Sequence, residues 1–221
     1  MDDIRFTMGV LNVSDAAHYL SLKRTTLQGW SGSDRDRAPI LRTLNSPPGE
    51  RRATFTLIAA AEAHALHALS QAGVRPHKIR PALSKLREWY GDNALVAPEL
   101  ATDGVDVLWN SARSPDGEGI IEGRTGQRVM KEIVEDYLQY VHWADDRIPD
   151  RLQLRAFLPH EVVIDPYRHF GQPYFSDSGV RVADIAGMLK ADEDPEVVAD
   201  EFDVDPRIVR TTARVALGTA A

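Results

Sequence analysis

Apolar positions near the N-terminus recur at helical spacing in two short segments. The first segment begins at Ser14 and ends near Leu20, and the second covers residues 24–30. We expect Ser14 to cap the first helix, because a hydroxyl at this position accepts a hydrogen bond from an unpaired amide of the first turn. The apolar side chains that would pack between the helices are Val13, Ala17, Leu20, Leu22, Leu27 and Trp30. The pattern predicts two helices joined by a tight turn at residues 21–23.

Two short apolar runs follow this helix pair and flank a strong turn signal. Residues 40–44 and 53–56 have the composition of strands, and residues 45–49 contain Asn, Ser, two Pro and Gly. We expect a β-hairpin here, which would form the wing of a winged helix-turn-helix.

The middle of the chain alternates between helical and strand-like patterns. An Ala-rich run at residues 57–69 and the apolar spacing of residues 76–90 predict two helices. From Leu95 the pattern favours short strands, including a weak alternation at residues 105–109, and residues 127–141 predict another helix with a broad apolar face.

The C-terminal part predicts a strand at residues 162–164 and three short helices at residues 182–190, 195–202 and 206–217. Asp-Pro pairs at 194–195 and 205–206 mark two helix starts, because Asp caps free amides and Pro suits the first helical position. The fold class is α+β, mainly α. We expect a winged helix-turn-helix with its following helices in 1–91, a mixed α/β region in 92–160 and a trihelical, homeodomain-like unit in 161–221.

The net charge of −7 hides an uneven distribution. Residues 1–91 carry a net charge of +5, and residues 92–221 carry −12. A polyanion would therefore be attracted by the first part of the chain and repelled by the second.

The candidate nucleic-acid contacts lie in the basic part. In a helix-turn-helix, the N-terminal end of the second helix meets base edges, and flanking cations hold the phosphate backbone. The candidates are Lys23, Arg24, Thr25 and Gln28 on the helix, with Arg42, Arg51 and Arg52 on the predicted wing. On the residues alone, DNA binding and an ordinary helical hairpin with solvated charges both stay open.

A second basic face lies on the last predicted helix, where Arg207, Arg210 and Arg214 follow helical spacing. The preceding helix and its flanks are acidic. Three interpretations stay open: a second DNA-reading helix, a protein-binding patch, or a charge-balanced solvated surface.

Other chemistry finds little support in the sequence. The chain has no cysteine, its glycines match no phosphate-binding motif, and His64 and His67 have no evident third metal ligand. A hydrolase would need a nucleophile and a base, and His142, His160 and His169 stand in no such arrangement. We therefore expect a non-enzymatic protein without metal or cofactor. The acidic N-terminus and short apolar runs predict a cytoplasmic chain without a leader or membrane span.

The motifs resemble a known family. Residues 163–166, 170–173 and 179–182, with the two Asp-Pro helix starts, are similar to a small bacterial domain found in VapB-type antitoxins. Residues 13–20 and 26–30 resemble the MerR-like winged helix-turn-helix, and residues 55–64 and 78–83 resemble the linking region of longer antitoxins in this group. The likeness covers nearly the whole chain.

This resemblance implies a type II antitoxin that binds a PIN-domain ribonuclease and represses its own operon by binding operator DNA, usually as a homodimer. Lys23 stands where MerR-like helices often have a serine cap, residues 174–178 depart from the family pattern, and the chain ends shortly after the last helix. These departures leave the toxin-binding residues open. The alternatives are a MerR-like regulator with a small-molecule sensor and no toxin, and a protein-binding adaptor.

Overall fold

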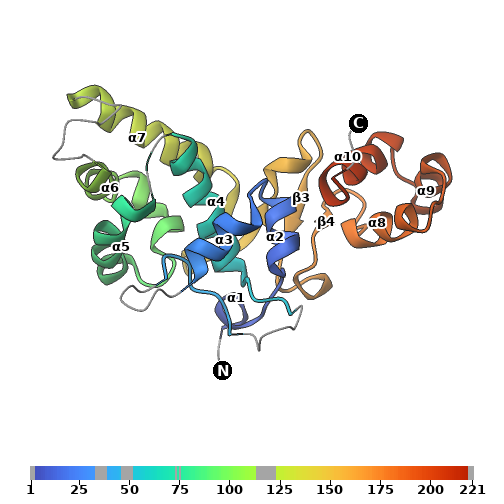
Figure 1. The fold of residues 1–221 in the computed structure, drawn as a ribbon, viewed down its shortest axis with the longest axis horizontal. Helices are drawn as coiled ribbons and strands as arrows, with labels where there is room; N and C mark the ends of the chain where they lie inside the picture. Colours follow the sequence, from blue (N-terminus) through green and yellow to red (C-terminus); the bar gives the residue numbers. More distant parts are fainter. Residues whose placement is uncertain are drawn as a thin grey trace.

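The protein consists of a helical body, a small antiparallel sheet beside it, and a three-helix unit at one end (Figure 1). The computed structural model describes residues 3–32, 39–45, 52–72, 74, 76–112 and 123–218. Within these residues, no helix is long and apolar enough to cross a membrane. The architecture is mainly helical with a minor β component, as expected.

The helices of the N-terminal and middle parts surround one long buried helix. They are α1 (Ile4–Thr7), α2 (Val13–Tyr19), α3 (Arg24–Ser31), α4 (Leu57–Gln71), α5 (Pro76–Tyr90), α6 (Val105–Ala112) and α7 (Gly123–Leu138). Short 3₁₀ turns η1 (Ala94–Val96) and η2 (Pro98–Ala101) connect α5 to α6. Most of α4 is buried, and its alanines let the surrounding elements pack closely against it.

The four strands form one sheet in the order β1-β2-β3-β4, with every neighbouring pair antiparallel. The strands are β1 (Val141–Trp143), β2 (Pro149–Gln153), β3 (Val162–Ile164) and β4 (Tyr174–Phe175), with 3₁₀ turns η3 (Arg155–Phe157) and η4 (His169–Gly171) between them. All three residues of β3 are buried. The strand predicted at residues 162–164 is confirmed.

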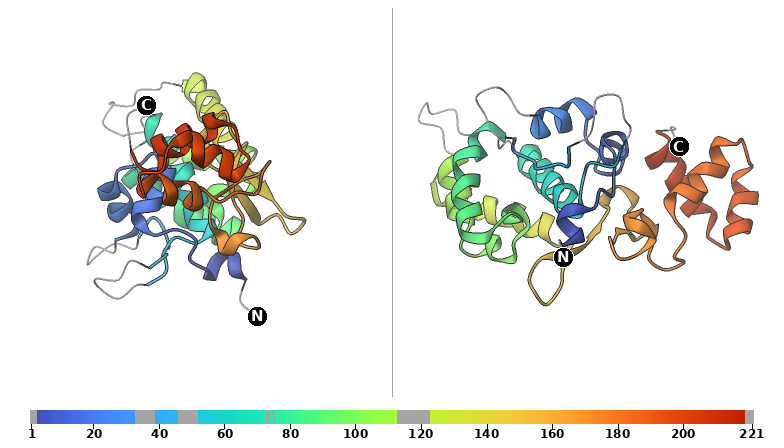
Figure 2. Two further views of the ribbon diagram at one scale, coloured as in Figure 1. Left: turned by 90° about the vertical axis from the view of Figure 1, so that its right-hand side faces the viewer. Right: turned by 90° about the horizontal axis from the view of Figure 1, so that it is seen from below.

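The C-terminal unit contains α8 (Val182–Lys190), α9 (Pro195–Phe202) and α10 (Pro206–Ala216), which agree closely with the predicted ranges. Asp194 accepts a hydrogen bond from the Glu196 amide at 2.8 Å, and Asp205 accepts one from the Arg207 amide at 2.7 Å. Both predicted caps are therefore present. The unit is joined to the body through α10, which packs against α2 and η3, and it projects to one side of the molecule (Figure 2).

Four local predictions were wrong. Asn12, not Ser14, caps α2, and its side-chain oxygen accepts from the amides of Ser14 and Asp15. The alternation at 105–109 belongs to helix α6, because Val105 and Leu108 are buried three residues apart. The strands expected from Leu95 are 3₁₀ turns. The helix expected at 127–141 begins at Gly123 and ends at Leu138, and Val141 begins β1.

The predicted wing differs as well. Residues 39–45 form no regular strand, and Phe55 makes an isolated antiparallel bridge with Leu11 instead of pairing within a hairpin. A single backbone bond between the two segments is described, from the Leu44 amide to the Thr54 carbonyl at 2.8 Å. The tip that would carry Arg51 lies outside the described residues.

Candidate nucleic-acid interface

Helix α3 is fixed in place by its apolar face. Leu27 is fully buried and Trp30 nearly so, and α3 packs against α2. The far end of α3 is held by the Ile40 and Leu41 amides, which donate to the Trp30 carbonyl at 2.9 and 3.0 Å. The predicted inward positions of Leu27 and Trp30 are confirmed, and the helix is oriented by the core, not by its polar residues.

The opposite face of α3 is open to solvent at its N-terminal end. Lys23, Arg24, Thr25 and Gln28 are all exposed. Lys23 occupies the N-cap position with extended backbone and makes no side-chain cap bond. The N-terminus of α3, with its partial positive charge, therefore lies beside two cationic side chains, an arrangement that attracts phosphate and other anions.

The other predicted DNA contacts lie on different segments. Arg42 is exposed and forms an ion pair with Asp92, which follows α5. Arg52 is exposed and has an interaction partner of its own. Arg51 lies outside the described residues. The structure therefore brings Lys23, Arg24, Thr25 and Gln28 together on one helix end, and it shows no contact that joins them to Arg42 or Arg52.

The second basic face is exposed along α10. Arg207 and Arg210 point to solvent, while the exposed Arg214 donates a hydrogen bond to the Ala156 carbonyl in η3 at 2.9 Å. The buried side of this helix carries Val209, Thr212 and Val215. Arg214 thus helps to attach the C-terminal unit to the body, and Arg207 and Arg210 have the freer side chains of the three.

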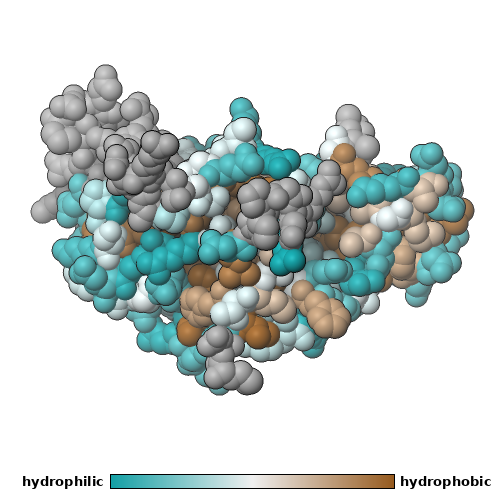
Figure 3. All heavy atoms as spheres, turned by 60° about the horizontal axis from the view of Figure 1, so that its bottom comes forward, coloured by the Kyte–Doolittle hydropathy of each residue, from teal (hydrophilic) through white to brown (hydrophobic). Residues whose placement is uncertain are grey.

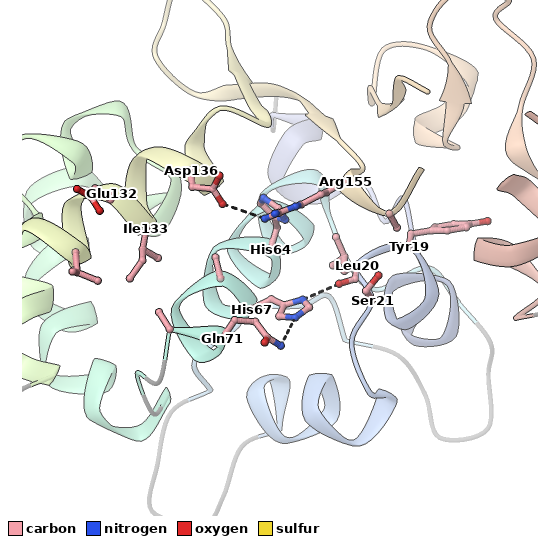
Figure 4. Close-up of a pocket in the computed structure, with 14 residues that line it drawn as sticks. Tyr19, Leu20, Ser21, His64, His67, Gln71, Glu132, Ile133, Asp136 and Arg155 are labelled. Carbon is pink, nitrogen blue, oxygen red and sulfur yellow. Dashed lines mark hydrogen bonds and ion pairs between the residues drawn. The ribbon is translucent and has the colours of Figure 1, made fainter. Parts of the chain in front are cut away.

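A pocket of about 720 Å³ lies behind the turn that joins α2 to α3 (Figure 4). His67 on α4 donates from Nδ1 to the Leu20 carbonyl at 2.9 Å and accepts from Gln71 at Nε2. These partners assign the neutral Nδ1–H tautomer. Asp136 on α7 and Arg155 in η3 form an ion pair at 3.1 Å at the pocket edge. The pocket is therefore lined by the end of α2 and the turn after it, by α4 and α7, and by η3.

His64 lies at the inner side of this pocket. It is 8% exposed, and the rings of Tyr137 and Tyr140 meet it edge-on at centroid distances of 6.5 and 5.6 Å. Burial lowers the pKa of the His64 imidazole to about 4, so the ring is neutral near pH 7. Within the described residues, no group of three His, Cys, Asp or Glu side chains could hold a metal ion.

A buried carboxyl–guanidinium pair was not predicted from the sequence. Glu62 on α4 is 1% exposed, and its Oε2 lies 3.5 Å from the Arg87 guanidinium of α5. Arg87 also donates to the Ile40 carbonyl at 2.8 Å. Burial raises the pKa of the Glu62 carboxyl to about 7, and the nearby Arg87 opposes this effect. The pair ties α4 and α5 to the segment that follows α3.

Three comparisons describe what this chain is similar to. A family model described as "Protein of unknown function (DUF433)" matches residues 162–214. A curated protein of Mycobacterium tuberculosis named "Putative antitoxin VapB45" is 39% identical and covers 94% of both chains. The X-ray crystal structure of Rv2018 from Mycobacterium tuberculosis superposes with a TM-score of 0.72 at 36% identity, covering 94% of this chain and 99% of the other. Because the likeness extends over almost the full length of both sequences, the chain belongs to the same family of VapB-type antitoxins as VapB45.

Proposed function

We propose that this protein is an antitoxin that binds operator DNA through α3, represses its own operon and neutralises a PIN-domain ribonuclease. The observation that carries the DNA-binding part is the exposed N-terminal end of α3. Lys23 and Arg24 stand there with Thr25 and Gln28, while Leu27 and Trp30 fix the helix in the core.

The chemistry of this helix end suits a major groove. Lys and Arg donate to the O6 and N7 atoms of guanine or to phosphate, and Gln pairs with adenine. The first-turn amides of α3 add donors for a phosphate. The DNA backbone on either side of the helix would be contacted by Arg42, Arg51 and Arg52. On binding, Arg42 would leave its ion pair with Asp92 and pair with a DNA phosphate instead.

The proposal includes a homodimer, because one helix-turn-helix reads only a few base pairs. Two copies place two recognition helices about one turn of DNA apart, roughly 34 Å, and read a palindromic site. The toxin part rests on the antitoxin name of the relative at 39% identity. The identity of the toxin as a PIN-domain ribonuclease follows from the family resemblance.

The DNA-binding part is tested with the double variant Lys23→Ala/Arg24→Ala. We expect the variant to lose its gel shift on the promoter of its own operon, with thermal stability within about 0.5 kcal/mol of wild type because both side chains are exposed. A matched control is Arg128→Ala/Lys131→Ala, which removes two exposed cations from α7. A normal shift from the α3 variant would contradict the proposal, as would an equal loss from the control.

One observation favours a second function, a MerR-like regulator with a small-molecule sensor and no toxin. The pocket lined by Tyr19, Leu20 and Ser21 lies directly behind the helix pair, and its volume is in the range of small-ligand sites. Deletion of the gene separates the two functions. An antitoxin is needed for growth when the adjacent toxin frame is intact and becomes dispensable when that frame is deleted. A sensor is dispensable in both strains.

A further inference from the structure

The loop between β3 and β4 exposes two aromatic side chains. Phe170 is 85% exposed, the highest fraction among the large apolar side chains in the described ranges, and Tyr167 is 64% exposed. Apolar side chains also gather on the neighbouring face that carries α1 (Figure 3). Met8, which follows α1, is half-buried next to Gly171 of the loop. A grouping of this kind on a polar surface is typical of an interaction site.

The backbone that displays Phe170 is strained. His169, Phe170 and Gly171 have φ values of 48°, 54° and 74°, so three successive residues are left-handed. Residues that have a Cβ atom avoid this region, because the Cβ atom approaches the following carbonyl oxygen. Such strain persists where the surroundings impose it, and it is concentrated at binding and active sites.

The surroundings of the loop impose this conformation. The buried Asp165 carboxylate accepts from the Tyr167 amide at 2.8 Å, and the ring of His169 contacts that of Tyr174 at a centroid distance of 4.8 Å. A Cβ at Gly171 would lie 2.2 Å from Val10 Cγ1, so the loop is pressed against the N-terminal segment. Phe170 is therefore held outward by a rigid base, which removes much of the ordering cost of binding.

The net charge of the C-terminal segment that contains the loop distinguishes between two kinds of partner. Residues 161–221 hold twelve acidic against six basic side chains. This excess of negative charge disfavours a nucleic acid and favours a basic protein. A ribonuclease must bind a polyanionic substrate, so it needs a cationic surface. Arg168, exposed beside Phe170, adds a hydrogen-bond donor for the partner's backbone carbonyls.

We propose that the loop of residues 165–172 is the surface by which this chain binds its toxin, with the Phe170 ring inserted into an apolar pocket of the ribonuclease. This inference rests on the proposed antitoxin function. Aromatic side chains that are fixed before binding and desolvated on binding commonly supply most of an interface's affinity.

The test is Phe170→Gly. Glycine adopts a φ of 54° without the steric penalty of phenylalanine, so the variant should keep or raise the melting temperature of the full chain. We expect its affinity for the purified product of the adjacent toxin frame to fall at least about tenfold by calorimetry, because the aromatic anchor is lost. A purely structural role for Phe170 would instead lower the melting temperature.

Val197→Ala is the control, because it removes another exposed apolar side chain, 51% exposed, from α9 and leaves the loop and the face of α1 unchanged. It should bind the toxin as wild type does. Toxin binding by Phe170→Gly with unchanged affinity would overturn the inference and leave the antitoxin function intact. Failure of the wild-type chain to bind the adjacent product would overturn both.

Two further results would also overturn the inference. If Phe170→Gly lost operator binding while retaining the toxin, the loop would be a nucleic-acid contact. If the variant shifted from dimer to monomer in size-exclusion chromatography with light scattering and still bound toxin, the loop would be an interface between copies.

Discussion

At the scale of single residues, two buried titratable groups lie two positions apart on α4. Their ionisation affects the stability of the fold in opposite pH ranges. His64 is kept neutral by burial, and Glu62 is driven towards its protonated form by burial. Neither group belongs to the proposed DNA contacts. Glu62 contacts Arg87 and His64 contacts two tyrosine rings within the core, so the titration of both groups should be seen first in stability.

The His64 prediction concerns acid. A histidine whose folded pKa of about 4 lies below the ordinary 6.5 contributes stability that is present above pH 6.5 and is lost as the pH falls towards 4. The full effect is roughly 3 kcal/mol, since one pKa unit corresponds to about 1.4 kcal/mol. Urea unfolding at pH 7 and pH 4 should show this loss of unfolding free energy in the wild-type protein. The loss should be smaller in His64→Leu. The exposed His18 provides the control: His18→Gln should keep the wild-type slope.

The Glu62 prediction concerns the alkaline side. A carboxyl whose folded pKa is raised to about 7 contributes stability below its unfolded pKa near 4.5, and this contribution disappears as the pH rises through 7. Glu62→Gln should therefore melt several degrees above wild type at pH 8.5 and close to it at pH 5. Glu132→Gln, at an exposed ion pair on α7, should follow wild type at both values. If Glu62→Gln raised the melting temperature more at pH 5 than at pH 8.5, the raised pKa of Glu62 would be contradicted.

At the scale of elements, the Asp-Pro starts of α9 and α10 act locally. Asp194→Ala and Asp205→Ala should each cost about 1 kcal/mol in chemical unfolding, because each leaves a first-turn amide without its acceptor. Asp200→Ala, at an exposed position within α9, should change stability by less than about 0.5 kcal/mol. Equal effects for all three variants would mean that charge, not capping, determines the result.

The same locality explains which elements the sequence predicts well. The C-terminal helices were predicted almost to the residue, because Asp, Pro and helical apolar spacing all act within a few positions. The α2 cap was misplaced by two residues, since Asn12 and Ser14 are both good caps and the sequence does not say where the chain turns. Residues 105–109 were assigned to a strand because an alternation over five residues also fits a helix with burial at 105 and 108.

Features that depend on contacts between distant parts of the chain could not be predicted from local sequence patterns. The strand-like run at 53–56 was recognisable, but its bridge to Leu11 depends on the tertiary fold. The exposure of Lys23, Arg24, Thr25 and Gln28 was predictable from helical spacing. The burial of Glu62 and the left-handed display of Phe170 were not, since each results from packing between segments far apart in sequence.

At the scale of the whole molecule, the uneven charge predicts a salt dependence. Operator affinity should fall linearly in a log–log plot against salt, with a slope of about −0.9 per neutralised phosphate. Lys23→Ala should reduce the magnitude of that slope by about one, whereas Lys131→Ala, on α7, should leave it unchanged. Fluorescence anisotropy with a labelled operator measures both. An unchanged slope for Lys23→Ala would remove this lysine from the phosphate contacts.

Helix α2 is shared between the two ends of the chain. One side of it supports α3, and another is covered by α10 and η3, where the Tyr19 and Phe157 rings meet at 5.8 Å. A chain shortened to its first 160 residues would keep η3 but lack α10, and the part of α2 that α10 covers would face water. The family-matched C-terminal segment therefore also covers an apolar surface of the N-terminal half. A shortened form that exposes this surface should be prone to aggregation.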